Sequence, residues 1–476
     1  MLIKIVRISN VAFFEFFGQD SCRAALSAYQ ENRGWSSLQG RKQKTVYLLL
    51  KVGNFVWLTN KLLQIRHIDI SLTQGRGLQI YDKHLLNLMT NRIFDMPDVH
   101  VDPNAPIRVN VLLPAFSIES ISAGFFGVFN VARFIKQCGY QVRIVLFDNF
   151  HYSQELFRNS LRNFPSFSNL LEEVEIEYIG ERQAPLTVSP NDGVVATVWY
   201  SAYFAEKIQK TINPQRPFLY LIQDYETAFF PFSSLNAFSD RAYLMSYNAL
   251  VSTATLLTYM QQFKRFCAGK QMVSFDNACS SILPSWETFK NTKQGRKKRF
   301  VFYSRPAVNR NMFELAALSI IQAFDEGAFG DASDWEFYGM GLGDVEIKLS
   351  PQMSITQIPR MTLKEYEESM YAFDVCLSLM ASPHPSIVPF DLASVGGLVV
   401  TNHFATKDAA YFNNISKNIF VAEPFPADIV RSIKEAVAKV DDFEGRYKNA
   451  QATNYPNSWN EVWKQEHVDL INNTFK

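Results

Sequence analysis

The sequence of 476 residues exceeds the size at which one hydrophobic core keeps growing, so two domains and an appended segment are expected. Hydrophobic residues make up 47% and charged residues 20%, which is typical of globular proteins, and the formal net charge of +1 gives no global field that would recruit nucleic acid. The five cysteines are odd in number and form no Cys-x-x-Cys pair, which argues against a disulfide framework or a structural zinc site and favours a reducing cytoplasm.

The first part of the chain, residues 1–104, mixes helix-like runs with scattered glycines and ends in a Pro/Asp-rich stretch. We interpret it as an accessory N-terminal segment that packs against the domain after it. The longest apolar stretch, residues 46–58, contains Lys51 and is too short to span a bilayer, and the first residues lack a signal-peptide pattern. A cytoplasmic protein is expected, with peripheral binding to the inner face of the membrane as the alternative.

Residues 105–290 read as a Rossmann-like domain. A buried strand at 107–114, a glycine turn from Gly124 to Gly127, a helix to residue 137 and a strand at 140–147 form one βαβ unit. Further strands are predicted at 174–179, 193–199, 217–223 and 249–253, with helices between them. This alternation predicts a parallel sheet covered on both faces.

A second Rossmann-like domain is predicted over residues 291–457. It begins with the polar stretch 291–299, which we interpret as a solvated interdomain hinge rather than a nucleic-acid patch. Strands are predicted at 300–304, 335–338, 354–358, 373–380, 398–401 and 419–421. Residues 458–476 are predicted to form one amphipathic helix.

The most informative segment runs from Ser382 to residue 402. A polar Ser-Pro-His-Pro-Ser turn follows a buried strand, a short helix carrying Asp391 comes next, and a Gly-Gly stop leads into an apolar strand. Ligands bind at the carboxyl ends of strands in open α/β sheets, and the amides that begin the next helix favour an anion. Arg305 and Arg360 each follow another predicted strand, so both are expected at the same sheet edge, although a surface or interdomain ion pair would explain either alone.

This pattern resembles the nucleotide-sugar site of retaining GT-B glycosyltransferases, and most closely the WsaF-like bacterial rhamnosyltransferases. The resemblance rests on the turn at Ser382, on Phe-Tyr-Ser-Arg-Pro ending at residue 306 with Arg310 and Asn311 after it, and on Leu-Ile-Gln-Asp-Tyr-Glu ending at Glu226. It spans about residue 106 to the C-terminus. It implies two Rossmann-like domains facing a central cleft, an acceptor domain first and a donor domain second, with the last helix crossing back to the first domain.

The resemblance also implies roles for the residues of the second domain. Arg305 and Arg360 would bind the donor diphosphate and stabilise the leaving phosphate, whereas Arg310 and Asn311 are weaker candidates that could simply open the next helix. Asp391 stands where the family carries a glutamate that accepts hydrogen bonds from the ribose, and it is shorter by one methylene.

The turn and the first domain add further candidates for the site. Ser382, His384 and Ser386 would line the donor site, although His384 could equally be a satisfied turn histidine. Because Pro383 replaces the usual first glutamate of the family, sugar recognition lacks its ordinary acceptor. Gly124 and Gly127 resemble the glycine turn that admits a sugar or phosphate to the backbone.

Polar and aromatic residues of the first domain are candidates for binding the acceptor. Asp224 and Glu226 end a predicted strand and could bind acceptor hydroxyls or act as a base, with a capping and turn cluster as the alternative. Trp199 and Tyr200 are predicted to end the neighbouring strand, where they would stack on sugars, and core packing is the alternative.

No Asp-x-Asp occurs in the sequence, and no His/Glu cluster has metal spacing, so neither a metal nor another cofactor is expected. The residues alone indicate a two-domain protein that binds a nucleoside diphosphate. The resemblance implies transfer of L-rhamnose from dTDP-L-rhamnose to a growing bacterial surface polysaccharide, with retention. A GT-B transferase that uses a UDP- or GDP-sugar and a non-catalytic sugar-binding module of a glycan-assembly complex are the alternatives, and a homodimer is one expected assembly.

Overall fold

The computed structural model describes residues 5–8, 11–14, 89–114, 123–148, 153, 155, 159, 173–341, 345–359 and 361–476. The chain divides into two compact units, residues 1–81 and 82–476. In the first unit, strands β1 (Ile5–Ile8) and β2 (Val11–Phe14) pair antiparallel. Most of the predicted accessory segment lies outside the described residues.

The second unit begins with a short helical turn and a strand that join the predicted first domain. Strand β3 (Val99–Val101) pairs in parallel with β7 (Leu186–Val188), and the Lys207 ammonium donates to the carbonyl of Pro97 at 2.8 Å. The Pro/Asp-rich stretch therefore contains a paired strand.

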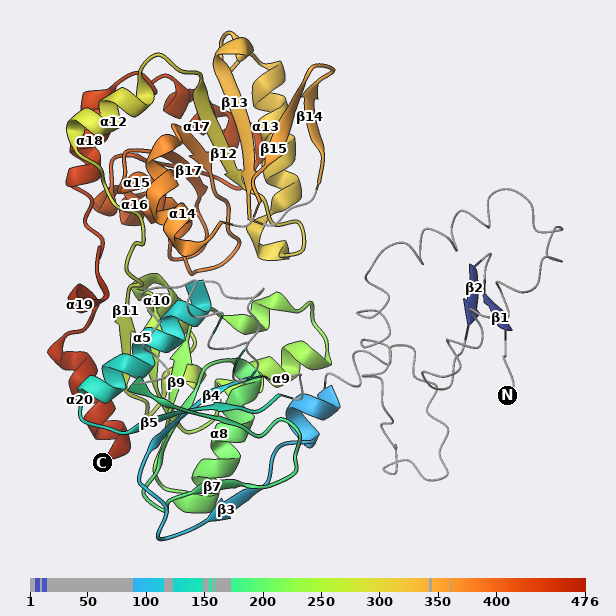
Figure 1. The fold of residues 1–476 in the computed structure, drawn as a ribbon, viewed down its shortest axis with the longest axis vertical. Coiled ribbons are helices and arrows are strands. Elements are labelled where there is room, and N and C mark those ends of the chain that lie inside the picture. Colours follow the sequence, from blue (N-terminus) through green and yellow to red (C-terminus); the bar gives the residue numbers. More distant parts are fainter. Residues whose placement is uncertain are drawn as a thin grey trace. The chain divides into compact units, whose positions relative to one another are not determined.

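The first large sheet has seven parallel strands in the order β11-β10-β9-β8-β4-β5-β6 (Figure 1). Every residue of its central strands is buried, which is why the sequence shows continuous apolar runs rather than alternation. The strands are β4 (Val109–Leu113), β5 (Val142–Leu146), β6 (Glu175–Tyr178), β8 (Gly193–Ala196), β9 (Phe218–Ile222), β10 (Tyr247–Ser252) and β11 (Met272–Phe275).

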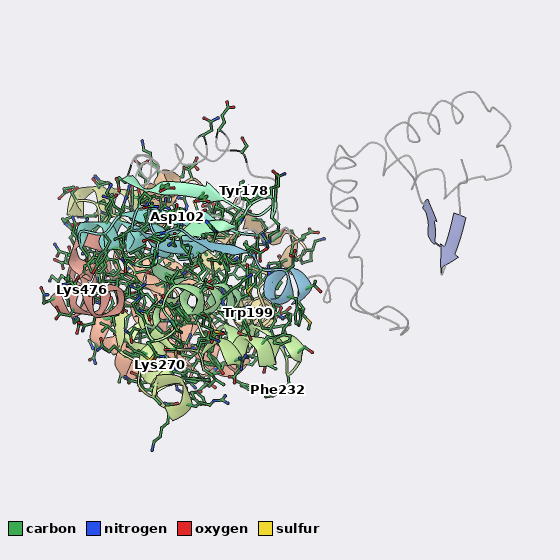
Figure 2. The ribbon with its side chains drawn as sticks, turned by 90° about the horizontal axis from the view of Figure 1, so that it is seen from below. Asp102, Tyr178, Trp199, Phe232, Lys270 and Lys476 are labelled. Carbon is green, nitrogen blue, oxygen red and sulfur yellow. The ribbon has the colours of Figure 1, made fainter. Side chains whose placement is uncertain are left out.

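Helices cover both faces of this sheet and bury two separate apolar cores. One core includes α5 residues, and the other includes α8 residues. The helical elements are η2 (Thr90–Phe94), α5 (Ala123–Gln137), α8 (Trp199–Ile212), η5 (Glu226–Phe229), α9 (Ser234–Ala242), α10 (Ala254–Gln261) and α11 (Lys264–Cys267). Between η5 and α9, Phe232 stands fully exposed at the edge of the molecule (Figure 2).

The second large sheet also has seven strands, in the order β14-β15-β13-β12-β16-β17-β18. Six are parallel, and the edge strand β14, which the sequence did not suggest, pairs antiparallel with β15. The strands are β12 (Lys298–Tyr303), β13 (Trp335–Met340), β14 (Ile347–Ser350), β15 (Met353–Gln357), β16 (Val375–Leu377), β17 (Leu398–Asn402) and β18 (Ile419–Ala422).

Helices again flank the sheet, and the two apolar cores on its faces confirm the second Rossmann-like half. Its helical elements are α12 (Trp286–Lys293), η6 (Asn309–Asn311), α13 (Phe313–Asp325), η7 (Ala332–Asp334), α14 (Leu363–Ser369), η8 (Met370–Ala372), α15 (Val388–Ala393), α16 (Ala409–Ile415), α17 (Pro426–Val437) and α18 (Phe443–Gln451). Two parallel α/β halves, as the sequence predicted, make up the second unit (Figure 1).

The C-terminal segment returns to the first half, as predicted, but it is two helices rather than one. Helix α19 (Trp459–Val462) ends before Trp463, which is extended, and α20 (Gln465–Phe475) follows. The Trp463 ring stacks on Phe134 of α5 at 4.3 Å, and Phe475 lies against Gly193, where a Cβ would meet the ring at 2.6 Å. Burial of these aromatic rings anchors the end of the chain on the first sheet.

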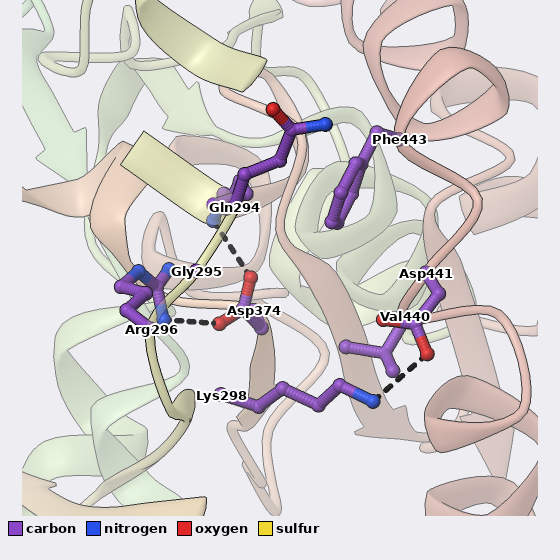
Figure 3. A pocket seen from close by; sticks show the side chains of 9 residues that line it. Gln294, Gly295, Arg296, Lys298, Asp374, Val440, Asp441 and Phe443 are labelled. Atoms are coloured by element: carbon purple, nitrogen blue, oxygen red, sulfur yellow. Dashed lines mark hydrogen bonds and ion pairs between the residues drawn. The ribbon is translucent and has the colours of Figure 1, made fainter. Parts of the chain in front are cut away.

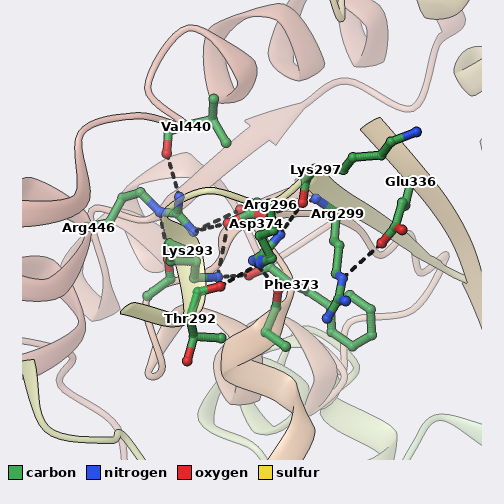
Figure 4. A network of polar contacts seen from close by, with 12 residues as sticks. Thr292, Lys293, Arg296, Lys297, Arg299, Glu336, Phe373, Asp374, Val440 and Arg446 are labelled. Carbon is green, nitrogen blue, oxygen red and sulfur yellow. Dashed lines mark hydrogen bonds and ion pairs between the residues drawn. The ribbon is translucent and has the colours of Figure 1, made fainter. Parts of the chain in front are cut away.

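The hinge prediction for residues 291–299 is wrong, because this stretch is built into the second half. Helix α12 extends to Lys293, which is 5% exposed, and β12 already begins at Lys298. The Asp374 carboxylate pairs with the Lys293 ammonium at 3.0 Å and with the guanidinium groups of Arg296 at 2.9 Å and Arg446 at 3.2 Å (Figure 4). The sequence predicted an exposed segment because it is rich in lysine and arginine, and the buried carboxylate that pairs with them is remote in sequence.

A pocket of about 220 Å³ lies beside this network (Figure 3). Its wall includes Lys298, which begins β12 and pairs with Asp441 at 2.8 Å. Asp374 immediately precedes β16, so the pocket lies at the amino ends of the strands. That edge is opposite to the one where open parallel sheets bind their ligands.

Candidate functional site

The predicted donor residues follow two strands that are neighbours in the second sheet. Arg305 comes after β12 and Ser382 after β16, and these strands pair directly. Because the chain leaves β12 for β13 on one side and returns to β16 on the other, this is the point where the strand order reverses. Ligands of doubly wound sheets bind outside the carboxyl ends of the strands at this point.

Buried polar atoms without a partner gather at the same edge. In the described part of the chain, Ser304 Oγ, Asn311 Oδ1 and Ser378 Oγ have no hydrogen-bond partner. Ser304 and Ser378 directly follow the two paired strands. Most buried polar groups in proteins are hydrogen-bonded, so a cluster of exceptions indicates a place that a ligand or water completes.

Arg305 lies at the centre of this edge with few protein contacts. Its guanidinium donates to the Tyr303 hydroxyl at 3.2 Å, and among the residues the structure describes no carboxylate lies within ion-pair distance of it. Gly341, at φ 128°, lets the side chain pass, because a Cβ there would meet Arg305 Cγ at 2.8 Å. The guanidinium is therefore available to bind an anion in bidentate fashion.

Arg310 and Asp224 link the two halves. The Arg310 Nε lies 3.4 Å from Asp224 Oδ2, and its guanidinium lies over the Phe229 ring at 4.4 Å. The Asp224 Oδ1 accepts one hydrogen bond from the Ser382 hydroxyl and another from the Tyr225 amide at 2.9 Å. The structure thus brings three predicted site residues together around one buried carboxylate.

The turn from Ser382 to Ser386 is held by its own side chains. The Ser382 Oγ accepts from the His384 amide at 3.1 Å, and His384 Nδ1 accepts from the Ser386 amide at 3.0 Å. The ring proton therefore resides on Nε2, which donates to Ser252 Oγ in the first half at 3.3 Å. Burial lowers the pKa of His384 to about 4, so the ring is neutral at physiological pH.

Asp391 is not brought together with the arginines. It is 1% exposed, and its Oδ1 accepts from the amides of Ser280 at 2.7 Å and Ser281 at 3.4 Å, whereas Oδ2 accepts from the Tyr366 hydroxyl at 2.9 Å. Burial raises the pKa of this carboxyl group to about 6. Three protein donors already use most of the acceptor capacity of this carboxylate, and the ribose contact stays a prediction.

The expected sugar platform at Trp199 and Tyr200 is wrong, because both rings are buried in a core. Strand β8 ends at Ala196, and the two residues instead begin α8, where they are 3% and 9% exposed. Glu226 Oε2 accepts from the Trp199 amide at 2.5 Å, so its carboxylate lies at the N-terminus of that helix. Burial raises the pKa of Glu226 to about 8. The capping alternative holds for Glu226.

The two glycines predicted as a turn are the second and fifth residues of α5, which begins at Ala123. A Cβ at Gly127 would meet Gln223 Oε1 at 2.6 Å, so the glycine is needed for the close approach of the Gln223 side chain rather than for a turn. The predicted glycine turn is therefore wrong, and the approach of a sugar or phosphate to these glycines stays a prediction.

Lys407 is a site residue that the sequence reasoning missed. It is 0% exposed, its ammonium donates to the carbonyl of Met380 at 2.6 Å, and within the described ranges no carboxylate pairs with it. Burial lowers its pKa to about 7, and Asp224 opposes this effect. Like Arg305, it lies in the loop that follows a strand, and this was the signal that could have identified it.

One predicted site residue cannot be placed in the structure. Arg360 falls outside the described residues. Among those that are described, no group of three or more His, Cys, Asp or Glu side chains could hold a metal ion, and no helix is long and apolar enough to cross a membrane.

Comparisons with known proteins agree with this geometry. Residues 108–255 match the family model described as WsaF, N-terminal domain, and residues 298–434 match WsaF, C-terminal domain, which together span more than half of the chain. The O-antigen biosynthesis protein RfbC of Myxococcus xanthus is 26% identical over 257 residues, which cover 52% of this chain and 18% of that protein. The chain therefore corresponds to less than a fifth of that relative's length.

Solved structures show the same fold. A mutant of S. aureus TarM in complex with fondaparinux, α-GlcNAc-glycerol and UDP superposes with a TM-score of 0.58 at 8% identity, covering 77% of this chain and 100% of that one. Anabaena HepE in complex with UDP superposes with a TM-score of 0.51 at 13% identity, covering 77% and 97%. At such identities the likeness shows the fold alone.

Proposed function

The chain belongs to the WsaF family of GT-B glycosyltransferases, and we propose that it transfers a deoxyhexose, L-rhamnose from dTDP-L-rhamnose, to a growing bacterial surface polysaccharide. The observation that carries this proposal is the convergence of Arg305, Arg310 and the Ser382 turn at the reversal point of the second sheet. The rhamnosyl donor comes from the family resemblance, and the role of the relative RfbC in O-antigen biosynthesis supports a polysaccharide product.

The donor diphosphate would bind between the two arginines and the turn. Arg305 offers a guanidinium without an acidic partner among the described residues, and Arg310 offers one whose partner is Asp224. Arg360 is also proposed to bind the diphosphate. Further proposed donor contacts come from Asn311, Ser382, His384 and Ser386. A diphosphate would compete with Asp224 for Arg310, because both are anions that pair with a guanidinium.

Catalysis would rest on stabilising the leaving phosphate as the glycosidic bond breaks. Fixed cations aimed at developing charge supply this without reorganisation, so the reaction is proposed to need no metal. Asp224 lies in the first half against Arg310 and Ser382, so it would lie beside the bound donor. We assign it the role of contacting the reacting sugar or acceptor.

Retention of configuration would follow from attack on the face that the phosphate leaves. The departing phosphate oxygen takes the proton of the acceptor hydroxyl, the new glycosidic bond forms as the old one breaks, and the nucleoside diphosphate is released. The reaction would take place in the cytoplasm, on the inner face of the membrane when the acceptor is bound there.

A UDP-sugar donor is the second candidate, because the similar structures of TarM and HepE hold UDP. A donor screen separates the two. The melting temperature of the protein is measured with dTDP-L-rhamnose, dTDP-glucose, UDP-glucose and GDP-mannose, and affinities are then determined by calorimetry. The proposal requires the tightest binding for dTDP-L-rhamnose. Tighter binding of a UDP- or GDP-sugar would replace the donor, and binding of none would end the assignment.

A further inference from the structure

A second group of buried polar atoms lies at the carboxyl edge of the first sheet. Asp276 and Asn277 directly follow β11, and Asp276 Oδ1 and Asn277 Oδ1 have no hydrogen-bond partner in the described part of the chain. Asn277 is 8% exposed, and Asp276 is partly exposed. Two adjacent acceptors without donors are an uncommon arrangement in a folded protein.

Groups from three other elements surround these atoms. A Cβ at Gly127 of α5 would lie 2.6 Å from Gln223 Oε1, which follows β9, and 3.7 Å from Asn277 Oδ1. From the second half comes the buried Tyr411 hydroxyl of α16, which lies beside the hydroxyls of Thr253 and Thr255. Burial raises the pKa of Tyr411, and Asp276 raises it further, which places the two side chains within electrostatic reach of each other.

This group of polar atoms differs from the proposed diphosphate site in its domain and in its charge. Arg305, Arg310 and the Ser382 turn belong to the second half, whereas the two orphaned acceptors and the Gln223 amide belong to the first. Burial raises the pKa of the Asp276 carboxyl group to about 6, and Lys464 only partly offsets this increase. An acidic group in this setting does not suit a phosphate.

The chemistry of the free atoms defines their ligand. Both orphaned atoms of the first half are acceptors, so they need donors, and the Tyr411 hydroxyl can donate as well as accept. A sugar ring presents hydroxyls that do both at adjacent carbons. A site built to pair buried acceptors with hydroxyls discriminates strongly against ligands that lack them.

We propose that Asp276 and Asn277, with Gln223 and Tyr411 beside them, form the subsite that binds the hydroxyls of the acceptor glycan's terminal sugar. This subsite rests on the proposed function, since it supplies the acceptor side of the same reaction. It replaces the platform that the sequence placed at Trp199 and Tyr200.

The test measures sugar binding directly. Saturation-transfer NMR is recorded on the whole chain with a panel of methyl glycosides (rhamnose, glucose, galactose and mannose) in the presence of saturating dTDP. The wild type is expected to bind at least one glycoside, and Asp276→Ala and Asn277→Ala to weaken that binding by about tenfold or more. Asn277→Asp keeps the acceptor oxygen and is expected to bind like the wild type.

The control is Gln209→Ala, which removes another buried amide whose Oε1 has no partner, on α8 and remote from this edge. It should leave glycoside binding unchanged. The dTDP-induced rise in melting temperature, measured on every variant, reports both folding and the donor site. Unchanged glycoside binding in both alanine variants, or no glycoside bound by the wild type, overturns the subsite. If the wild type does not bind dTDP, the proposed function is overturned. Glycoside binding by the wild type and the variants can then still be compared.

Discussion

Replacing Arg305 by alanine isolates the cation that the donor phosphate would meet. Within the described part of the chain, the side chain donates one hydrogen bond, to the Tyr303 hydroxyl at 3.2 Å, so its loss should lower the free energy of unfolding by only about 0.5–1.5 kcal/mol. A hydrogen bond from a charged group to phosphate is worth about 1.5–3 kcal/mol. We therefore expect the Kd for dTDP to rise by about 10–150-fold, because each 1.4 kcal/mol is about a factor of ten.

Isothermal titration calorimetry with dTDP at physiological ionic strength is the assay. Arg299→Ala is the matched control, since Arg299 pairs with Glu336 at 3.0 Å on the surface and its removal changes the net charge by the same amount. Screening limits the long-range effect of either charge to about 8 Å. Arg305→Lys should fall between the wild type and the alanine variant, because it keeps the charge but not the bidentate fork. Equal Kd values for Arg305→Ala and Arg299→Ala would refute the phosphate contact.

Three further outcomes are expected. EDTA should leave turnover unchanged, because the proposed mechanism stabilises the leaving group with side-chain cations, and a loss that Mg²⁺ restores would contradict this. Asp374→Asn should lower stability to urea by about 3–5 kcal/mol, because it leaves Lys293 and Arg446 buried without their counter-ion. Burial raises the pKa of Asp374, but the ion pairs with Lys293, Arg446 and Arg296 outweigh burial, so the net pKa is lowered. The wild type should therefore lose stability more steeply than the variant as pH falls below about 4. Parallel pH profiles of the two proteins would argue against the ion pairs. The burial that lowers the pKa of Lys407 to about 7 should make wild-type stability rise between pH 7 and about 10, and a Lys407→Met profile with the same slope would show that another group titrates.

The parallel halves could be predicted because buried strands leave continuous apolar runs that need no knowledge of their neighbours. Helix starts were harder. Trp199 and Tyr200 continue an apolar run, so they were predicted as strand. In the structure, Glu226 accepts from the Trp199 amide and Ser201 Oγ accepts from the amides before the helix, and these contacts mark where the helix begins. Edge strand β14 was missed because its alternation of buried and exposed residues extends over only four positions.

The site was predictable to the extent that strand ends determine it. Arg305 and Ser382 could be placed at one edge because both follow strands, and the pairing of β12 with β16 makes them neighbours. Burial was not predictable, because it depends on segments remote in sequence. Asp391 is enclosed by residues about 110 positions earlier and by Tyr366, and the unpaired acceptor oxygens of Asp276 and Asn277 could be identified only from the structure.

Transfer of the sugar itself tests the central claim most directly. Purified protein is incubated with radiolabelled dTDP-L-rhamnose and membranes from cells that lack this chain, and label is counted in the polysaccharide fraction. The account predicts incorporation by the wild type, retention of the anomeric configuration in the product, and at least about tenfold less incorporation by Arg305→Ala. Absence of incorporation from dTDP-L-rhamnose, with incorporation from a UDP- or GDP-sugar under the same conditions, would contradict the assigned donor.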